Sequence, residues 1–289
     1  MNLQKSLLTT ALFAVLSVNA QAGFVADGDL KDWLAAPTGT GNDWLPSDSS
    51  VKYTIEDQSG LENDGFLNPG LGGQAYDAEA IYLKQTANFF YVAVVTGLSP
   101  KTIDYPAGDL AFDFGNDGSY EYGVVVKSDS HNTNVNSAEN GGIGSKGDVY
   151  KVSKWNVGLW ADDDSHTGIG QGTQAHPTTV NAGNKLGKVE LVYKEAFYDG
   201  SKLLSQLGSY KGSHYVIEAK IPTFLFATTD LAKAFTVHWT MACANDAIDV
   251  DPPASQVPSP TTLPLLALGL TMLLGFSRKL NLLTPNNIN

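Results

Sequence analysis

The sequence predicts an all-β protein whose folded region is an antiparallel β-sandwich with long rim loops. Many short segments are rich in β-branched and aromatic residues, Gly and Asn turn signals separate them, and no long amphipathic helix stands between them. We expect one sandwich domain over residues 23–250, because all-β domains of this length occur as single units. We also expect an N-terminal signal peptide before this domain and a C-terminal hydrophobic helix after it.

The first strands are predicted by alternation and by one dense apolar run. Residues 51–55 and 78–83 alternate in polarity, as half-buried strands do. Residues 89–95 are almost entirely β-branched or aromatic, which predicts a central strand buried on both faces.

A tight hairpin is predicted next. Residues 110–114 and 120–126 have strand composition, and Gly115, Asn116, Asp117 and Gly118 lie between them. Asn, Asp and Gly tolerate the positive φ angles that such a turn requires.

The second half of the domain is predicted to hold short strands between loops. Residues 128–147 and 161–187 are polar and are expected to be long rim loops. Residues 223–232 are expected to form a short helix after Pro222, and residues 203–207 a helical turn. The predicted strands are residues 148–154, 155–160, 188–193, 215–221 and 235–241.

The folded region is acidic. All 30 Asp and Glu residues lie within residues 23–257, with 15 of the 18 Lys and Arg residues, which gives a net charge of −15. Nucleic acid is not an expected partner, because its binding depends on Lys and Arg that displace counterions. The acidity suits a soluble exported protein, or one that meets cations. Cys243 is the single cysteine, and its apolar neighbourhood predicts an inert core thiol.

The hairpin loop carries carboxylates in part of the spacing of an acidic calcium loop. Asp113, Asp117 and Glu121 fall at the first, fifth and ninth positions of such a loop, and Gly118 at the sixth. Gly115 occupies the third position, where a carboxylate or amide is expected, and the flanks are strands. A plain hairpin is the favoured interpretation, and a calcium site of Asp113, Asp117 and Glu121 is the alternative.

Other acidic residues leave two interpretations open. Residues 27–33 read Asp-Gly-Asp-Leu-Lys-Asp-Trp, which could ligate calcium or could form a turn that lets Trp33 hold the first segment on the core. The structural interpretation is favoured. Residues 76–79 and 245–249 place further acids at strand ends, and Asp113 could meet Asp246 only if the strand order allows it.

We expect the protein not to be an enzyme. The histidines show no zinc-binding spacing, and the chain has neither a Gly-x-Ser-x-Gly elbow nor a Gly-rich phosphate loop. His238, in the last predicted strand, is expected to be a satisfied core or rim residue.

Three tryptophans are candidates for ligand binding. Trp44, Trp155 and Trp160 have flat rings that could stack on sugars, with core packing as the alternative for each.

The two ends of the chain have the layout of export and sorting segments. Residues 1–22 combine Lys5, a short apolar segment and a small-x-small site before Gly23, which predicts a cleaved signal peptide. Residues 251–262 form a Pro-rich linker, residues 263–280 a hydrophobic helix with a basic stop, and residues 281–289 a tail. The motif residues are Val257, Pro258, Ser259 and Pro260, and the basic residues are Arg278 and Lys279.

This C-terminal arrangement resembles the PEP-CTERM sorting signal. In that family a Val-Pro-Glu-Pro-like motif precedes one hydrophobic helix and an Arg-rich end, and here Ser259 replaces the usual Glu. The resemblance implies export by the general secretion machinery and processing by an exosortase-like enzyme. The expected location is the cell envelope, with transient membrane anchoring, and then the cell surface or extracellular matrix.

The folded region is similar to family 9 carbohydrate-binding modules and DOMON-like sandwiches through residues 27–33. That resemblance implies a jelly-roll-like sandwich, and its members bind sugars, haem or calcium. We therefore expect a non-catalytic structural or adhesive protein. The alternative is a carbohydrate-binding module, assisted by calcium, with polysaccharide as its partner.

Overall fold

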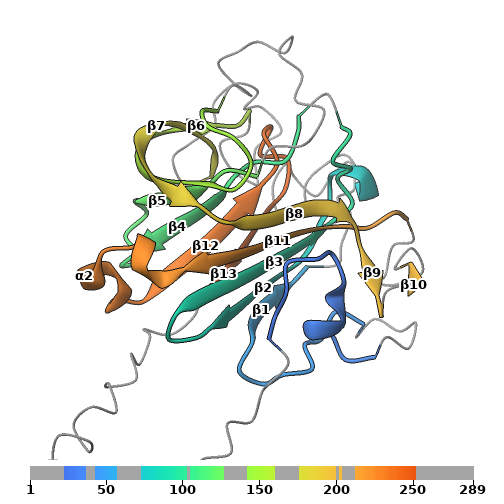
Figure 1. Ribbon diagram of the computed structural model, residues 1–289. Coiled ribbons are helices and arrows are strands. Elements are labelled where there is room, and N and C mark those ends of the chain that lie inside the picture. Colours follow the sequence, from blue (N-terminus) through green and yellow to red (C-terminus); the bar gives the residue numbers. More distant parts are fainter. Residues whose placement is uncertain are drawn as a thin grey trace, which may run out of the picture.

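The chain folds as two antiparallel sheets packed face to face, a β-sandwich (Figure 1). The computed structural model describes residues 23–36, 43–56, 73–102, 105–126, 142–159, 176–199, 202–203 and 212–251. One sheet has five strands in the order β1-β2-β3-β11-β8, and the other has six in the order β13-β12-β4-β5-β6-β7. The predicted antiparallel sandwich is confirmed.

The five-stranded sheet consists of β1 (Lys52–Ile55), β2 (Ala78–Gln85), β3 (Phe89–Thr96), β11 (Tyr215–Pro222) and β8 (Glu190–Glu195). The six-stranded sheet consists of β13 (Ala247–Val250), β12 (Phe235–Thr240), β4 (Leu110–Phe114), β5 (Tyr122–Val124), β6 (Asp148–Val157) and β7 (Pro177–Lys188). A separate ribbon pairs β9 (Phe197–Tyr198) with β10 (Lys202–Leu203). The short helices are η1 (Leu30–Asp32), η2 (Gly73–Tyr76), η3 (Thr223–Leu225) and α2 (Thr228–Leu231).

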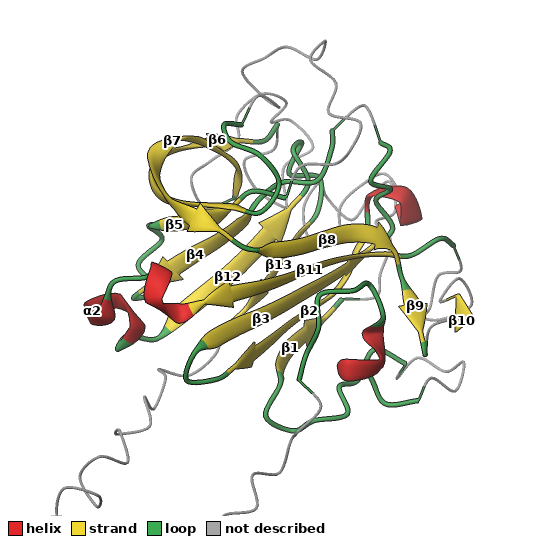
Figure 2. Cartoon of the chain, in the orientation of Figure 1, coloured by secondary structure: helices red, strands yellow, loops and turns green. Residues whose placement is uncertain are grey.

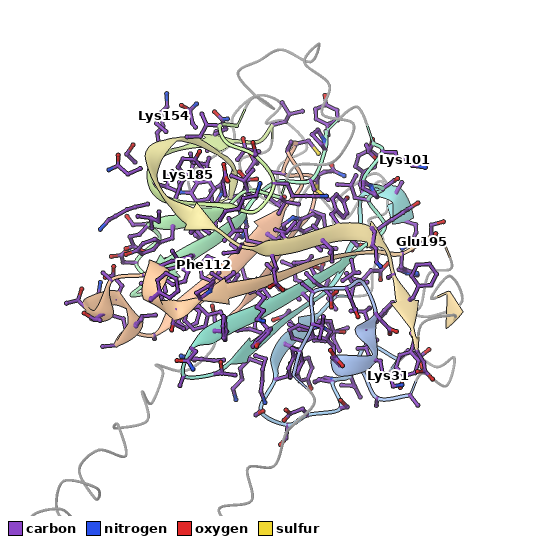
Figure 3. The ribbon with its side chains drawn as sticks, viewed as in Figure 1. Lys31, Lys101, Phe112, Lys154, Lys185 and Glu195 are labelled. Atoms are coloured by element: carbon purple, nitrogen blue, oxygen red, sulfur yellow. The ribbon has the colours of Figure 1, made fainter. Side chains whose placement is uncertain are left out.

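The main core lies between the sheets and is rich in phenylalanine. Phe90 of the five-stranded sheet packs against Phe235 of the six-stranded sheet, with ring centroids 5.1 Å apart. Phe112 and Phe226 join them, and Figure 3 labels Phe112 in the middle of the sandwich. Burying each such ring contributes about 1.5–3 kcal/mol, so this cluster is a major source of the domain's stability.

A second apolar layer covers the outer face of the five-stranded sheet. Trp33 and Trp44, from the N-terminal segment, pack there with Ala93 and Val95 of β3. The other face of β3 contributes Phe90, Val92 and Val94 to the main core. The structure therefore confirms that this strand is buried on both faces, and it shows that the N-terminal segment provides the outer cover.

The predicted hairpin is also present. β4 pairs with β5 in antiparallel register. Asn116 and Gly118 have φ angles of 53° and 83°, and Gly115 has a φ of 125°. The turn chemistry of the sequence thus fixed the local structure, because these residues accept left-handed backbone at low cost.

Residues 161–187 are not one long loop, contrary to the sequence prediction. Residues 177–187 belong to β7, which pairs along β6 through several register shifts. Figure 2 shows these two strands curling away from the rest of their sheet as a ribbon. Many residues of β7 are exposed or half-buried, so this strand does not need alternating apolar side chains. Its sequence therefore lacks the pattern by which a strand is predicted. Residues 148–154 and 155–157 are likewise one strand rather than two.

The prediction of a single short helix over residues 223–232 is wrong. The chain forms η3 and α2 instead, because Ala227 between them is extended, with a ψ of 139°. Lys202–Leu203 form β10, so the predicted helical turn at residues 203–207 begins in a strand, and the rest of it lies outside the described residues. β13 is a further strand that the sequence pattern did not predict.

Most of the predicted export and sorting segments lie outside the described residues. These are residues 1–22 and 252–289, which include the hydrophobic helix and its basic stop. Among the residues that the structure does describe, no helix is long and apolar enough to cross a membrane.

Candidate functional site

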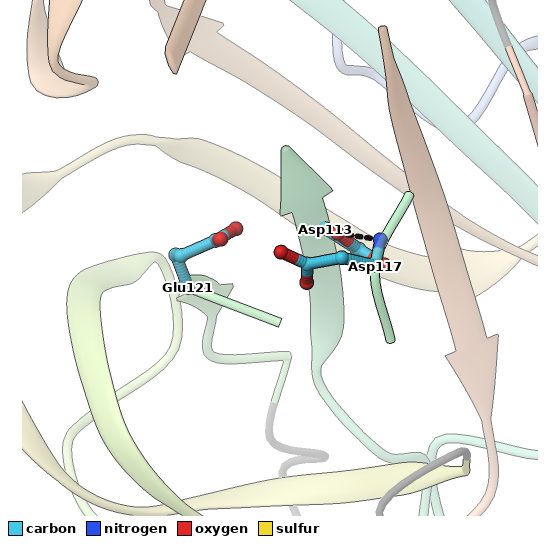
Figure 4. Close-up of side chains that lie close together, drawn as sticks. All are labelled: Asp113, Asp117 and Glu121. Carbon is cyan, nitrogen blue, oxygen red and sulfur yellow. Dashed lines mark hydrogen bonds between the residues drawn. The ribbon is translucent and has the colours of Figure 1, made fainter. Parts of the chain in front are cut away.

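The β4–β5 hairpin brings its three predicted calcium-binding carboxylates together (Figure 4). Asp113 is the second-to-last residue of β4, Asp117 lies in the turn, and Glu121 precedes β5. One carboxylate oxygen from each lies within 4.8 Å of the others. This spacing fits ligands around one calcium ion, whose oxygen distances are about 2.3–2.6 Å.

The same carboxylates also accept hydrogen bonds from the hairpin backbone. Gly118 N donates to Asp113 Oδ2 at 2.7 Å, and Asp117 N donates to Asp113 Oδ1 at 3.2 Å. Phe114 N donates to Glu121 Oε2 at 2.8 Å. Burial raises the pKa of Glu121, and the charges of Asp113 and Asp117 add to that effect. The loop is therefore a well-bonded turn that could also take a cation, and both interpretations of the sequence remain.

The Asp-Gly-Asp-Leu-Lys-Asp-Trp segment is held by one buried carboxylate, Glu218 of β11. Trp33 Nε1 donates to Glu218 Oε1 at 2.8 Å, and Asp27 N donates to Oε2 at 3.0 Å. Gly28 N donates to the same oxygen, and its φ of 82° lets the backbone come this close. These contacts support the structural interpretation of the motif, since Trp33 is 2% exposed and lies in the outer apolar layer.

A second group of carboxylates is buried at the side of the sandwich where β13 packs against β1 and β2. We call it the buried acidic cluster, and its members are Glu56, Asp77, Glu79 and Asp246. Asp77 is 2% exposed, and Glu79 and Asp246 are fully buried. The sequence placed acids at these strand ends but could not show that they meet. Asp246 joins Asp77 rather than Asp113.

Backbone contacts hold the cluster together. Ala78 N donates to Asp246 Oδ2 at 2.7 Å, which links the start of β2 to the segment before β13. Glu56 N donates to Glu79 O at 2.9 Å. β2 has a bulge between Ala78 and Ala80, the point at which Glu79 stands. Bulges commonly redirect side chains beside functional sites.

The electrostatics of the cluster are unfavourable for full ionisation. Burial is the largest cause that raises the pKa of Glu56, Asp77 and Asp246, and neighbouring carboxylates raise each pKa further. The carboxyl groups of Asp77 and Asp246 lie within hydrogen-bonding reach of each other. Neither oxygen of Asp77 accepts a hydrogen bond within the described part of the chain.

Gln74 and His214 border the cluster at Glu79. His214 Nε2 lies 3.0 Å from Glu79 Oε1, and Gln74 Nε2 donates to the same oxygen. His214 is 2% exposed, and its ring meets Trp44 edge-on at 5.1 Å. Gln74 also lines a cavity of about 350 Å³ with Tyr76, Ser99, Thr102, Ser213 and Tyr215.

The residues best suited to catalysis are buried. His238 is fully buried and its Nδ1 lies 2.6 Å from Asp249 Oδ1, as expected for a satisfied histidine. Burial raises the pKa of the Cys243 thiol to about 12, so the thiolate needed for nucleophilic attack is absent near neutral pH. These groups are interpreted as structural.

The candidate tryptophans do not form an exposed platform. Trp44 is fully buried, and Trp155 is 6% exposed with its Nε1 donating to Tyr120 O at 2.8 Å. Both therefore lack the open ring face that stacking on a sugar requires, while Trp160 lies outside the described residues. Trp155 does line a hollow of about 300 Å³ beside Glu121 and Lys154.

No protein-family model and no curated protein matches this chain.

Proposed function

We propose that the protein is an exported, non-catalytic β-sandwich with a structural or adhesive role at the cell surface or in the extracellular matrix. The observation that most supports this proposal is the order of segments in the sequence. A signal-like segment, a folded domain and a sorting-like tail with Val257, Pro258, Ser259 and Pro260 follow one another. Burial of His214, His238 and Cys243 in the described domain supports a non-catalytic role.

The sorting part of this proposal includes an exosortase-like enzyme that acts near the motif. The first experiment is the intact mass of the protein from fractionated native cells. The expected mass begins at Gly23 and ends near residues 258–262, in the outer or matrix fraction. A mass that retains Arg278 and Asn289, found in the inner membrane, would show a plain anchor and overturn the sorting proposal.

A matched pair of variants sharpens that experiment. Pro260→Ala changes the motif and is expected to leave an uncut chain in the inner membrane. Ser255→Ala, in the preceding linker, serves as the control and is expected to be processed normally. Ser259→Glu restores the usual residue of the PEP-CTERM family, and it is expected to increase the processed fraction if the native motif is cut slowly.

Carbohydrate binding is the second candidate function, and one observation favours it. Glu121 of the hairpin carboxylates and Trp155 line the same hollow, together with the exposed Lys154. A calcium ion on Asp113, Asp117 and Glu121 would stand beside this hollow and could bind sugar hydroxyls there. The jelly-roll-like relationship to family 9 carbohydrate-binding modules is part of this second proposal.

Saturable binding to a polysaccharide panel, with and without calcium, tests the second candidate. Lys154→Ala is expected to weaken binding about tenfold or more, and Lys101→Ala is the control because Lys101 is an exposed lysine away from the hollow (Figure 3). Binding that is equally strong in both variants would place the ligand elsewhere. Absence of saturable binding to every polysaccharide would leave the structural role alone.

A further inference from the structure

We propose that the edge of β8 (Glu190–Glu195) pairs antiparallel with the same strand of a second copy of this chain, about a two-fold axis at Val192. The two five-stranded sheets would then form one continuous sheet. This inference goes beyond the proposed function and does not depend on the sorting segments, because it concerns only the folded domain.

β8 is the last strand of its sheet, with β11 on one side of it (Figure 2). Its six residues pair with β11 without a register shift. The opposite edge of the same sheet, β1, packs against β13, and the outermost strand β7 of the other sheet pairs with β6 through several register shifts. Among the described strands, β8 therefore offers a regular edge, which is the kind that accepts a further strand.

The direction in which each β8 residue turns its backbone groups follows from two hydrogen bonds at the ends of the strand. Ala196 N donates to His214 O at 2.9 Å, on the β11 side. Val189 N donates to Gly147 O at 2.8 Å, away from β11. Because this direction alternates along an antiparallel strand, the even-numbered residues of β8 bond to β11 and the odd-numbered residues turn their groups to the free edge.

Leu191 and Tyr193 are the odd-numbered residues in the middle of this edge. Within the described part of the chain, no backbone hydrogen bond reaches the N–H and C=O groups that they turn outward. The side chains of Glu190 and Lys194 are exposed and that of Val192 is half-buried. A second β8 with Val192 opposite Val192 sets Leu191 opposite Tyr193, so these residues can exchange N–H···O bonds in both directions.

The charges on β8 are complementary in this register. Glu190 and Lys194 lie on the same face of the strand, about 13 Å apart, so they cannot pair with each other within one chain. Neither forms an ion pair with another group in the described part of the chain. In the register centred on Val192, Glu190 of each copy lies opposite Lys194 of the other, in the non-hydrogen-bonded pairs that bring side chains closest.

Charged side chains on an edge strand commonly keep other strands away, and this is the alternative interpretation. On β8 the charges do oppose other registers. A register centred on Lys194 sets the two lysines opposite each other, and one centred on Tyr193 leaves Lys194 opposite Val192. The same charges favour the register centred on Val192, which is the pattern of a specific contact rather than of a protected edge.

The contact uses one strand from each copy, so it is small and is expected to be weak in dilute solution. Copies that are held side by side have a high effective concentration, which favours the pairing. Dimerisation should therefore depend on protein concentration. It should also weaken with added salt, because the ion pairs are exposed.

The test measures the oligomeric state of the full chain by sedimentation velocity, over about a hundredfold range of protein concentration. A non-ionic detergent is present throughout, so that the apolar C-terminal segment does not itself cause association. We expect a monomer–dimer equilibrium, with slower amide hydrogen exchange in residues 190–195 at high concentration. A chain that stays monomeric over the whole range, or exchange that does not slow, overturns the proposal.

Charge variants test the register. Glu190→Lys sets a lysine opposite Lys194 in both pairs, and it should weaken dimerisation about ten- to hundredfold. The double variant with Glu190→Lys and Lys194→Glu exchanges the two charges and should restore dimerisation. Glu195→Lys is the matched control, since it makes the same change of charge on an exposed residue of the other face (Figure 3), and it should dimerise as the native chain does.

Three outcomes with these variants would contradict the pairing. They are dimerisation of Glu190→Lys as strong as that of the native chain, an equal loss in Glu195→Lys, and a folded double variant that stays monomeric. Lys194 also lies against Gly28, so thermal unfolding is used to show that the double variant is folded. If it is not, the comparison of Glu190→Lys with Glu195→Lys decides.

Discussion

Glu218 and Asp77 are both buried carboxylates, but the chain gives them opposite surroundings. Glu218 accepts hydrogen bonds from Asp27 N, Gly28 N and Trp33 Nε1. Asp77 accepts none within the described residues, and it faces other carboxylates instead. A buried acid surrounded by donors is part of the fold, because its bonds hold a segment in place. A buried acid without donors is stabilised when it keeps its proton, and the Asp77 carboxyl can then share a hydrogen bond with Asp246.

The domain thus contains one buried carboxylate that holds a segment in place and a group of buried carboxylates that repel one another. The Glu218 contacts hold the N-terminal segment over the five-stranded sheet through donors that the chain itself supplies. The buried acidic cluster joins the two sheets at their β2 and β13 side, and its contribution depends on whether its carboxyl groups are protonated. Four experiments test whether Glu218 and the buried acidic cluster differ in this way.

The largest effect is expected from Glu218→Ala. The change leaves two backbone N–H groups and the Trp33 Nε1 buried without their acceptor, each at a cost of about 1–3 kcal/mol. We expect the free energy of unfolding in urea to fall by about 3–6 kcal/mol. Glu218→Gln keeps an acceptor and is the control. A loss below about 1 kcal/mol in Glu218→Ala would contradict the structural role.

The next effect is a fall in stability with rising pH when metal is absent. Burial raises the pKa of Glu218 to about 8, and it raises the pKa values of Glu56, Asp77 and Asp246 as well. The folded chain therefore keeps protons on these carboxyl groups up to a higher pH. In the unfolded chain the same groups release their protons near their ordinary pKa of about 4. Stability from these groups is complete below about pH 4 and is lost as the pH rises through about 8.

Chelator-treated protein should thus lose about 2–4 kcal/mol between about pH 5 and about pH 9, measured by urea unfolding. The range begins above about pH 5 because carboxylates such as the half-buried Asp48, whose pKa is lowered by its hydrogen bond with Lys84, act in the opposite direction at lower pH. A free energy of unfolding that stays constant over this pH range would mean that these acids are ionised in the folded state.

Asp77→Asn should have a smaller and stabilising effect in metal-free protein. At about pH 8 the folded chain keeps a proton on Asp77 that the unfolded chain releases, and the amide removes the cost of that proton uptake, so the free energy of unfolding should rise by about 1–3 kcal/mol. A variant that is less stable without calcium would show that Asp77 has a partner of its own.

The smallest effect is expected from Asp117→Asn in the hairpin. Asp117 is exposed, and an amide oxygen can still accept from Ser119 N as the carboxylate does at 3.0 Å. We expect a change within about 0.5 kcal/mol in metal-free protein. A large loss would show that the hairpin carboxylates are strained or that they carry more of the turn than their contacts suggest.

The sequence alone determined the elements whose signal is local. Residues 89–95 predicted a strand buried on both faces because their side chains are apolar at successive positions, and β3 has that environment. The turn between β4 and β5 followed from Asn and Gly at positions that need positive φ. The spacing of Asp113, Asp117 and Glu121 also sufficed, because the three residues belong to one hairpin and cannot lie far apart.

The tertiary structure decided what depends on strand order. Trp44 became core because the N-terminal segment folds over the outer face of the five-stranded sheet, and β7 is a strand because β6 pairs with it. Asp246 meets Asp77, across 169 residues of sequence, because β13 packs against β2, whereas Asp113 lies at the far end of β12. Local periodicity fixes which face of a strand is buried, but it carries no information about which strands become neighbours.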